Sequence, residues 1–274
     1  MSDARLFLVK VGGEVVADHA HLHALANNVC ALKNTGRSVV VVHGGGPQVS
    51  ALQEKLGQVV RKVAGQRVTS EDDVFAVTAS LAGTVNVSLC AALVTAGVPA
   101  FGCHGASGGM IACHKRPARE VPGHGVVDYG EVGDVDAVDV GGLRALLGSG
   151  YVPVVATLGI ERATGRVLNV NGDTAAAATA AALGADVVIL VTAVGGVFRD
   201  RHDPTTRLAE LTVAQARALI ADGTIVDGMI PKVFEAIALL ERGVGAVVIA
   251  SAAAPRTFTA IAAGGSSVGT RLRK

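Results

Sequence analysis

Two glycine clusters follow apolar runs of the sequence and could hold a phosphate group. One is the triplet at 44–46, after VVVVH, and the other is the pair at 12–13, after LFLVKV. Glycine after a strand often marks only a tight turn. At a helix N-terminus, however, bare backbone N–H groups and the helix dipole attract anions. Two clusters in this position, one of them beside Lys10, favour an anion site over a simple turn.

Three charged side chains stand where a phosphate site would need them. Lys10 is a charge inside an apolar strand pattern, so it should face an anion or a carboxylate; the alternative is an edge-strand lysine that reaches water. Lys232 lies in DGMIPKV at the start of a helical pattern, where a cation opposes the dipole unless a phosphate lies between them. Asp173 stands in NVNGDT before an apolar helix. Alone it would be an ordinary N-cap, but the asparagines at 169 and 171 suggest a polar wall.

Several common motifs are absent from the sequence. The phosphate loop G-x-x-x-x-G-K-[ST] does not occur, and G-x-G-x-x-G does not follow the first strand, which argues against P-loop NTPases and Rossmann dehydrogenases. Cys103-His104 and Cys113-His114 could suggest a metal site, but the close C-x-x-C spacing of structural zinc is missing. We therefore expect no metal held by protein side chains.

The segments that would position these residues alternate along the chain. Five short apolar runs are typical of strands, at 6–13, 39–46, 152–159, 187–196 and 246–251, and helical patterns occupy 20–35, 48–56, 70–96, 139–147, 174–183, 212–222 and 231–242. This alternation predicts an α/β fold, a three-layer αβα sandwich around a mainly parallel central sheet. Ligands bind such sheets outside the carboxyl ends of the strands, where the glycines stand.

Other segments have a different character. Residues 60–68 predict a short polar hairpin that turns at Ala64-Gly65. Residues 106–136 are rich in Gly, His and charge and indicate irregular hairpins and loops. A second such region at 161–165 separates two halves of similar build. We expect two lobes that share one continuous sheet, residues 1–158 and residues 159–274.

Composition narrows the class of protein. The 274 residues are 50% hydrophobic, with no Trp and two Tyr, and the mean hydropathy is +0.47. Such a core suits parallel strands buried under helices. A net charge of +1 gives no attraction to nucleic acid or to a membrane surface. No apolar run reaches about 18 residues, no signal peptide is evident, and four cysteines make no disulfide framework, so we expect a cytoplasmic protein.

In their order along the chain, these motifs resemble the acetylglutamate kinase family of the amino-acid kinase superfamily. The motifs are VKVGG, VVVHGGGPQV, GQRVT followed by LAGTVN, NVNGDTAAA, DGMIPKV and a terminal VGTRL. GxRVT with LAGTxN is more specific to acetylglutamate kinases than to their relatives. The resemblance implies transfer of the γ-phosphate of ATP, bound with Mg²⁺, to the side-chain carboxylate of N-acetyl-L-glutamate in arginine biosynthesis. The N-terminal lobe would bind the acylated amino acid and the C-terminal lobe ATP.

The resemblance also implies roles for individual residues. The catalytic positions fall on Lys10, Asp173 and Lys232. The substrate positions fall on Gly45, Gly46, Arg67 and Asn169. ATP and its phosphates would meet Gly12, Gly13, Gly44, Thr192, Gly195, Gly196, Ile225, Gly228 and Met229.

The chemistry of such a reaction agrees with these residue types. A side-chain carboxylate is ionised at pH 7, since its pKa is about 4.3, so no general base is needed. Cations and N–H donors must instead stabilise charge on the transferred phosphoryl group. We expect Lys10 to act on that group, Lys232 on the departing β-phosphate, and Asp173 to hold both ammonium groups. Arg67, on the hairpin, would clamp the substrate α-carboxylate bidentately, and Asn169 would meet its amide or carboxylate.

Two positions depart from the family pattern. Ala193 stands where the family's T-D-V-x-G has aspartate, and Ser107 stands where its G-x-D-G has aspartate. The three catalytic positions remain, so we expect an active kinase. The alternatives are the kinase of carrier-protein-bound aminoadipate in lysine synthesis, a catalytically weak amino-acid sensor, and carbamate kinase, which is disfavoured because the chain lacks room for that family's extra subdomain.

The resemblance further suggests how copies of the chain assemble. Arginine-inhibited members of the family carry an extra N-terminal helix that links dimers into a hexameric ring, and here only five residues precede the first strand. We therefore expect a C2 homodimer that arginine does not inhibit. Its contact would lie on the N-terminal half, with the apolar helix at 74–96 as the candidate face.

Overall fold

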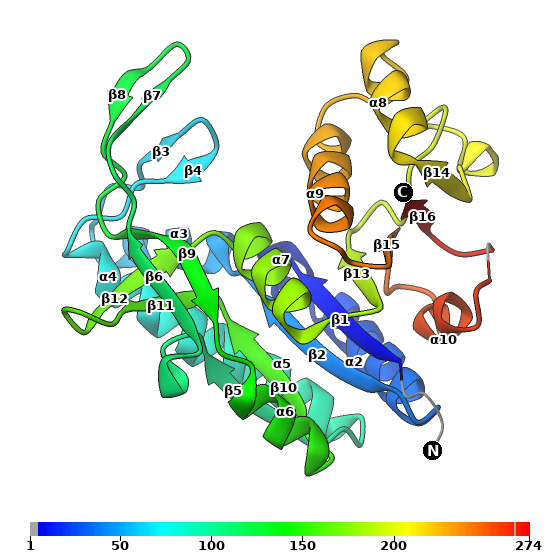
Figure 1. Cartoon of the computed structure of the whole chain (residues 1–274), viewed down its shortest axis with the longest axis horizontal. Coiled ribbons are helices and arrows are strands. Elements are labelled where there is room, and N and C mark those ends of the chain that lie inside the picture. The colour runs from blue at the N-terminus through cyan, green and yellow to red at the C-terminus, as the bar shows by residue number, and fades with distance from the viewer. Residues whose placement is uncertain (1–4, 266) are drawn as a thin grey trace.

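The computed structural model describes residues 5–265 and 267–274, and its centre is a sheet of eight strands (Figure 1). The strand order is β14-β16-β15-β13-β1-β2-β10-β5. Neighbouring strands run parallel except β15 and β16, which are antiparallel. The strands are β1 (Leu6–Val11), β2 (Ser38–His43), β5 (Ala100–His104), β10 (Val152–Ala156), β13 (Val187–Val191), β14 (Glu210–Thr212), β15 (Ala246–Ala250) and β16 (Thr270–Arg273). The predicted mainly parallel sheet, continuous between the two halves of the chain, is confirmed.

Helices cover both faces of the sheet, which confirms the three-layer arrangement. One hydrophobic core lies between the sheet and α6, α7, α8 and α9, and another lies between the sheet and α1, α2, α5 and α10. The helices are α1 (Gly13–Ala17), α2 (His19–Lys33), α3 (Gly46–Lys55), α4 (Asp73–Thr78), α5 (Asn86–Thr95), α6 (Gly141–Gly148), α7 (Gly172–Leu183), α8 (Val213–Ala221), α9 (Met229–Glu241) and α10 (Thr257–Ala262). Two short turns of 3-10 helix are η2 (Ser107–Gly109) and η3 (Pro204–Thr206).

Alternation along β1 decides which helices Lys10 faces. Successive side chains of a strand point to opposite faces of the sheet. Phe7 and Val9 belong to the core beneath α2 and α5, whereas Leu8 belongs to the core beneath α7 and α9. Lys10 follows Leu8 by two residues, so it points toward α7 and α9.

The predicted strands and helices are present, with shifts at their ends. β1 ends at Val11 and β2 at His43, so the glycines that follow form the turns into α1 and α3. The predicted strand at 152–159 is two strands, β10 and β11 (Leu158–Glu161), because the chain leaves the large sheet after Ala156. The predicted helix at 70–96 is a helical stretch from Asp73 to Thr95 in which η1 (Ala79–Val85) is a π-helix.

A second, smaller sheet is the main departure from the predicted fold. Four short strands close into a barrel in the order β11-β12-β9-β6, with β6 (Ile111–Lys115), β9 (Val132–Val138) and β12 (Arg166–Val170). The prediction of irregular hairpins and loops at 106–136 missed these strands, because short strands rich in charge and glycine give no apolar run. Residues 161–165 are the turn between β11 and β12. The lobe boundary after residue 158 stays a prediction.

Two hairpins project together beyond the sheet, at the upper left of Figure 1. β3 (Lys62–Val63) and β4 (Gln66–Arg67) pair across Ala64 and Gly65, whose φ angles of 47° and 77° are both positive, and this confirms the predicted hairpin. β7 (Arg119–Val121) and β8 (Gly125–Val127) form the other hairpin. They are linked, because Arg119 donates a hydrogen bond of 3.2 Å to the side chain of Gln66.

The helical stretch Asp73–Thr95 corrects one expectation from composition. Within its 23 residues, a window of 18 has a mean hydropathy of 1.7, which by length and composition alone would suffice to cross a membrane. The expectation that no apolar run reaches that length is therefore wrong. Core helices meet the same criteria, and this stretch places Val77, Leu81 and Leu89 in the hydrophobic cores of the fold.

Candidate active site at the centre of the sheet

The strand order of the sheet reverses beside β1. This first strand lies between β2, which follows it in the chain, and β13, from the C-terminal half. Open α/β sheets bind ligands at such a point, outside the carboxyl ends of the strands. The loops leaving β1, β2 and β13 carry the glycines at 12–13, 44–46 and 195–196. The fold thus brings three predicted phosphate-binding segments to one edge of the sheet.

Lys10 lies near this edge, between two carboxylates. Its Nζ atom is 2.5 Å from Oδ1 of Asp173 and 3.3 Å from Oε1 of Glu235. Burial lowers the pKa of Lys10, but attraction to the two carboxylates outweighs burial and raises the pKa above its usual value. Lys10 is therefore a cation that pairs with one carboxylate on α7 and another on α9. The expectation that it faces a carboxylate is met, and β1 is a central strand of the sheet rather than an edge.

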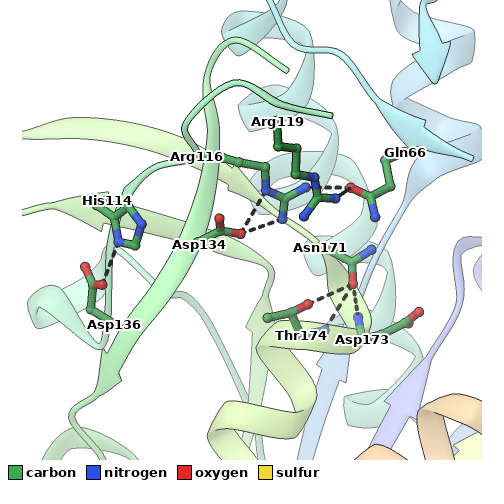
Figure 2. Close-up of polar contacts among 9 residues, drawn as sticks. All are labelled: Gln66, His114, Arg116, Arg119, Asp134, Asp136, Asn171, Asp173 and Thr174. Atoms are coloured by element: carbon green, nitrogen blue, oxygen red, sulfur yellow. Dashed lines mark hydrogen bonds and ion pairs between the residues drawn. The ribbon is translucent and has the colours of Figure 1, made fainter. Parts of the chain in front are cut away.

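Asn171 rather than Asp173 caps α7. Its Oδ1 atom accepts hydrogen bonds from the backbone N–H groups of Asp173, at 2.9 Å, and Thr174, at 3.0 Å (Figure 2). The interpretation of Asp173 as a simple N-cap is wrong, because its carboxylate is left to pair with Lys10. Asp173 holds only one of the two ammonium groups assigned to it. Within residues 5–265 and 267–274, Lys232 makes no ion pair.

The first two glycine loops pack directly against each other. A Cβ atom on Gly13 would lie 2.9 Å from the Cα atom of Gly45, closer than real Cβ contacts come. Helix α3 begins at Gly46, after Gly45, with no side-chain cap. Its first N–H groups have no partner inside the helix and can donate to an anion. Glycine is therefore required here by the close approach of two backbones.

His43 and Asn86 support the glycine triplet from inside the protein. His43 is fully buried at the end of β2, and its Nδ1 atom lies 2.9 Å from the carbonyl oxygen of Gly44. A carbonyl accepts, so Nδ1 carries the proton, and Nε2 accepts from Nδ2 of Asn86 at 3.0 Å. Burial lowers the pKa of His43 to about 4, which keeps the ring neutral. The C=O and the next N–H of a trans peptide point in opposite directions, so the N–H of Gly45 points away from the ring.

A cavity of about 170 Å³ opens beside the glycine triplet. The four residues predicted to bind the amino-acid substrate all line it, namely Gly45, Gly46, Arg67 and Asn169, and so do Gly44, Asn171 and Gly172. The Arg67 guanidinium donates to the carbonyl of Gly46 at 2.8 Å, to Oγ of Ser50 at 2.7 Å and to the side chain of Gln53. The guanidinium is thus oriented toward the cavity by α3.

A second guanidinium, that of Arg116, lines the same cavity. Arg116 is only 6% exposed, and its Nε and Nη2 atoms lie 2.8 and 2.6 Å from Oδ1 of Asp134 (Figure 2). Its Nη1 atom donates to Oε1 of Gln66 at 2.5 Å. Arg116 therefore ties the β3–β4 hairpin, which carries Arg67, to the small barrel.

Another cavity, of about 280 Å³, opens on the C-terminal half. Four residues predicted to bind ATP line it, namely Gly196, Ile225, Gly228 and Met229. The predicted catalytic Lys232 lines it too, with apolar side chains such as Val197 and Phe198. Thr192 and Gly195 shape the turn after β13, where the N–H of Gly195 donates to Oγ1 of Thr192 at 3.1 Å. Gly12 and Gly13 lie at the start of α1 and do not line this cavity.

Besides His43, sequence reasoning missed three of these residues for different reasons. Glu235 follows Lys232 by three residues, so one helical turn places both on one face, but nothing in a helix pattern distinguishes Glu235 from a solvated glutamate. Arg116 lies in a stretch interpreted as loop. Asn86 ends the LAGTVN motif, and only the fold shows that it bonds to His43 and to the carbonyl of Val154, at 2.9 Å.

Comparison with known proteins shows which family this chain belongs to. The chain belongs to the amino acid kinase family, whose sequence profile matches residues 5–251. A solved structure, smu.665 from Streptococcus mutans UA159, superposes with a TM-score of 0.75 at 29% identity, covering 98% of both chains. Carbamate kinase from Giardia lamblia bound to AMP-PNP superposes with a TM-score of 0.68 at 18% identity, covering 100% of both chains. At 18% identity this likeness shows the shared fold and does not separate the protein from carbamate kinases.

Sequence identity separates this protein from the carbamate kinases. The chain is 46% identical to the acetylglutamate kinase of Sorangium cellulosum (strain So ce56) over 267 residues, which are 97% of this chain and 93% of the relative. It is thus a member of the acetylglutamate kinase family, as its motifs predicted.

Proposed function

We propose that the protein is an N-acetyl-L-glutamate kinase, which transfers the γ-phosphate of ATP to the side-chain carboxylate of its substrate. The observation that carries this is the position of Lys10. One partner of Lys10, Asp173, is next to Gly172, which lines the same cavity as Arg67. The other partner, Glu235, lies one helical turn after Lys232, which lines the other cavity. A cation so placed lies where a phosphoryl group would pass from one ligand to the other.

The proposed roles follow from charge and geometry. Lys10 stabilises the transferred phosphoryl group together with the N–H groups of the glycine triplet, and Lys232 stabilises the departing phosphate. Asp173 holds Lys10, with Glu235 as a second anchor that the sequence did not indicate. The acceptor carboxylate is already ionised at neutral pH, so none of these groups needs to remove a proton.

Arg67 and Asn169 are proposed to bind the amino-acid substrate. Both line the smaller cavity, and the guanidinium of Arg67 can meet a carboxylate with two parallel N–H groups once the carboxylate replaces the bond from Nη2 to Gly46 or Ser50. Arg116 adds a second guanidinium to that wall, with its charge paired to Asp134. N-acetylglutamate carries two carboxylates, which guanidinium N–H donors suit.

ATP is proposed to bind along the larger cavity, with its phosphates directed toward Lys232 and Lys10. The fold relative from Giardia lamblia is bound to AMP-PNP, an ATP analogue. Mg²⁺ would come with the nucleotide, held by phosphate oxygens and water. In the described part of the chain no cluster of three or more His, Cys, Asp or Glu side chains is placed to hold a metal.

Two finer features are also proposed. The protein is a homodimer whose contact includes the outer face of α5, where Val87 and Val94 are 63% and 57% exposed. It works in the cytoplasm, where ATP is available. The expectation that arginine does not inhibit the protein falls on residues 1–4, which lie outside the described residues.

A coupled assay of ADP formation tests the function. N-acetyl-L-glutamate should support turnover at least tenfold better in kcat/KM than N-acetyl-L-aminoadipate, since one methylene in a fitted pocket is worth about 1–3 kcal/mol. Preference for the longer acid would favour the aminoadipate kinase instead. Nucleotide or substrate binding without any turnover would indicate the amino-acid sensor.

A further inference from the structure

Glu235 is a buried carboxylate in direct contact with Lys10. It lies on α9, and its side chain is 8% exposed. Its Oε1 and Oε2 atoms are 3.3 and 3.5 Å from the Nζ atom of Lys10. Oε1 makes no hydrogen bond in the described part of the chain, although it is buried. Phosphoryl transfer gives this carboxylate no evident task, because the acceptor needs no base.

The charges around Glu235 balance only without a nucleotide. The charged groups that act on it are Lys10 from β1, Asp173 from α7 and Lys232 from its own helix. Two ammonium groups and two carboxylates cancel. The phosphates of a nucleotide add negative charge beside the same two lysines, and a nearby like charge disfavours an ionised carboxylate. Protonation of one carboxylate of the cluster would relieve that repulsion.

We propose that Glu235 is a proton-linked positioning residue, which holds Lys10 before nucleotide binds and takes up one proton when the phosphates reach that lysine. The step is balanced: one carboxylate oxygen gains a proton from solvent, the ion pair with Lys10 is lost, and Lys10 pairs with phosphate. Asp173, at 2.5 Å, keeps the lysine in place during the exchange. The inference rests on the proposed function, because it needs nucleotide phosphates beside Lys10.

The environment already favours this protonation. Burial raises the pKa of Glu235 to about 7, against the attraction of Lys10. Above pH 7 the carboxylate is mainly ionised, so nucleotide binding there must draw a proton from solvent. The pKa rises on binding, so the affinity for nucleotide falls as pH increases above 7, by up to about tenfold for each pH unit.

Calorimetric titration with the magnesium complex of AMP-PNP measures the proton directly. At pH 8, the heat of binding in buffers of different ionisation enthalpy gives the number of protons taken up. Wild type should take up close to one proton more than Glu235→Gln, and its Kd should rise from pH 7 to 8.5 more steeply. Protonation of the nucleotide itself is common to both proteins and cancels. Glu241→Gln, on the exposed side of the same helix and paired with Arg217, should match wild type.

Each result of this titration has one meaning. Equal proton uptake by wild type and Glu235→Gln overturns the inference and leaves the proposed function intact, even if the variant is slower. It would mean that Glu235 stays ionised, for example as a ligand of the metal. Glu235→Ala, which makes no contact with Lys10, should repeat the loss of uptake if Glu235→Gln folds poorly. Failure of wild type to bind AMP-PNP overturns the proposed function, and with it this inference.

Discussion

Lys10 and Lys232 are the ammonium groups assigned to the transferred and departing phosphates. Alanine at either position should lower kcat by about 10²–10³-fold, because each cation acts on charge that develops in the transition state. Stability should change little for Lys232→Ala, since Lys232 makes no ion pair in the described part of the chain. Steady-state kinetics and thermal unfolding check both statements. Near-normal kcat in either variant would remove that lysine from the mechanism.

Arg67 is the group assigned to the substrate α-carboxylate. Arg67→Lys should chiefly raise KM for N-acetylglutamate, by roughly tenfold or more, because an ammonium cannot reproduce two parallel N–H donors. It should leave KM for ATP close to that of wild type, because Arg67 lines only the smaller cavity. An increase in KM for ATP instead would reverse the assignment of the two cavities.

His43 should make the protein less stable in mild acid. Burial lowers its pKa from 6.5 to about 4, so between these values the unfolded chain binds a proton that the folded chain does not. Stability therefore falls as pH decreases from 6.5 to 4, by up to about 3 kcal/mol from this group. Urea unfolding at pH 7 and pH 5 should show a smaller loss for His43→Asn than for wild type. His23→Asn, at an exposed position of α2, serves as the control and should behave as wild type does.

The contacts of a side chain could be predicted from the sequence where its residue type conflicts with the surrounding strand or helix pattern. A lysine within an apolar strand demands a partner, and Lys10 was identified for that reason. Glu235 and Arg116 agree with their local patterns, a helix and a charged loop, so their burial follows only from the packing of distant segments. His43 also gave no signal in the sequence, because a histidine at the end of a strand is common on the surface as well.

The contact between the first two glycine loops is a packing requirement that can be tested by itself. Gly13→Ala would place a methyl group 2.9 Å from the Cα atom of Gly45 and 2.8 Å from Cδ of Pro47. The loops must separate, and a displacement near 1 Å at a catalytic centre costs about 10²-fold in rate. We expect that loss in kcat. Gly148→Ala in α6, where an added Cβ meets nothing within 4 Å, should keep full activity.

Long apolar runs were predicted more accurately than short strands. β1, β2, β13 and β15 lie in a sheet covered on both faces, so almost all their residues are apolar and the pattern is plain. The strands of the small barrel have one face toward solvent. β9 has the sequence VGDVDAV, which is equally typical of a loop. Its pairing with β6 and β12 could be found only from the three-dimensional structure.

Assembly of two copies should depend on the outer face of α5. Val87 and Val94 lie seven residues apart, two helical turns, and so share one exposed face. Light scattering should give twice the chain mass of 27.5 kDa for wild type and the single mass for Val87→Lys. Val126→Lys, at a 71% exposed position on the β7–β8 hairpin, should remain dimeric. A mass of six chains, or a dimer that persists in Val87→Lys, would refute the proposed contact.

The central position of β1 also determines when the protein can begin to work during its synthesis. β1 pairs with β2 early, but its other edge waits for β13, and Leu6 bonds to Asp186, 180 residues later. At about 5–20 residues per second, a ribosome needs roughly 10–35 s to supply that neighbour. Until then the nascent chain keeps an open strand edge, which is prone to mispairing. Glu235 appears later still, 225 residues after Lys10, so the cluster of Lys10, Asp173 and Glu235 is among the last parts of the molecule to form.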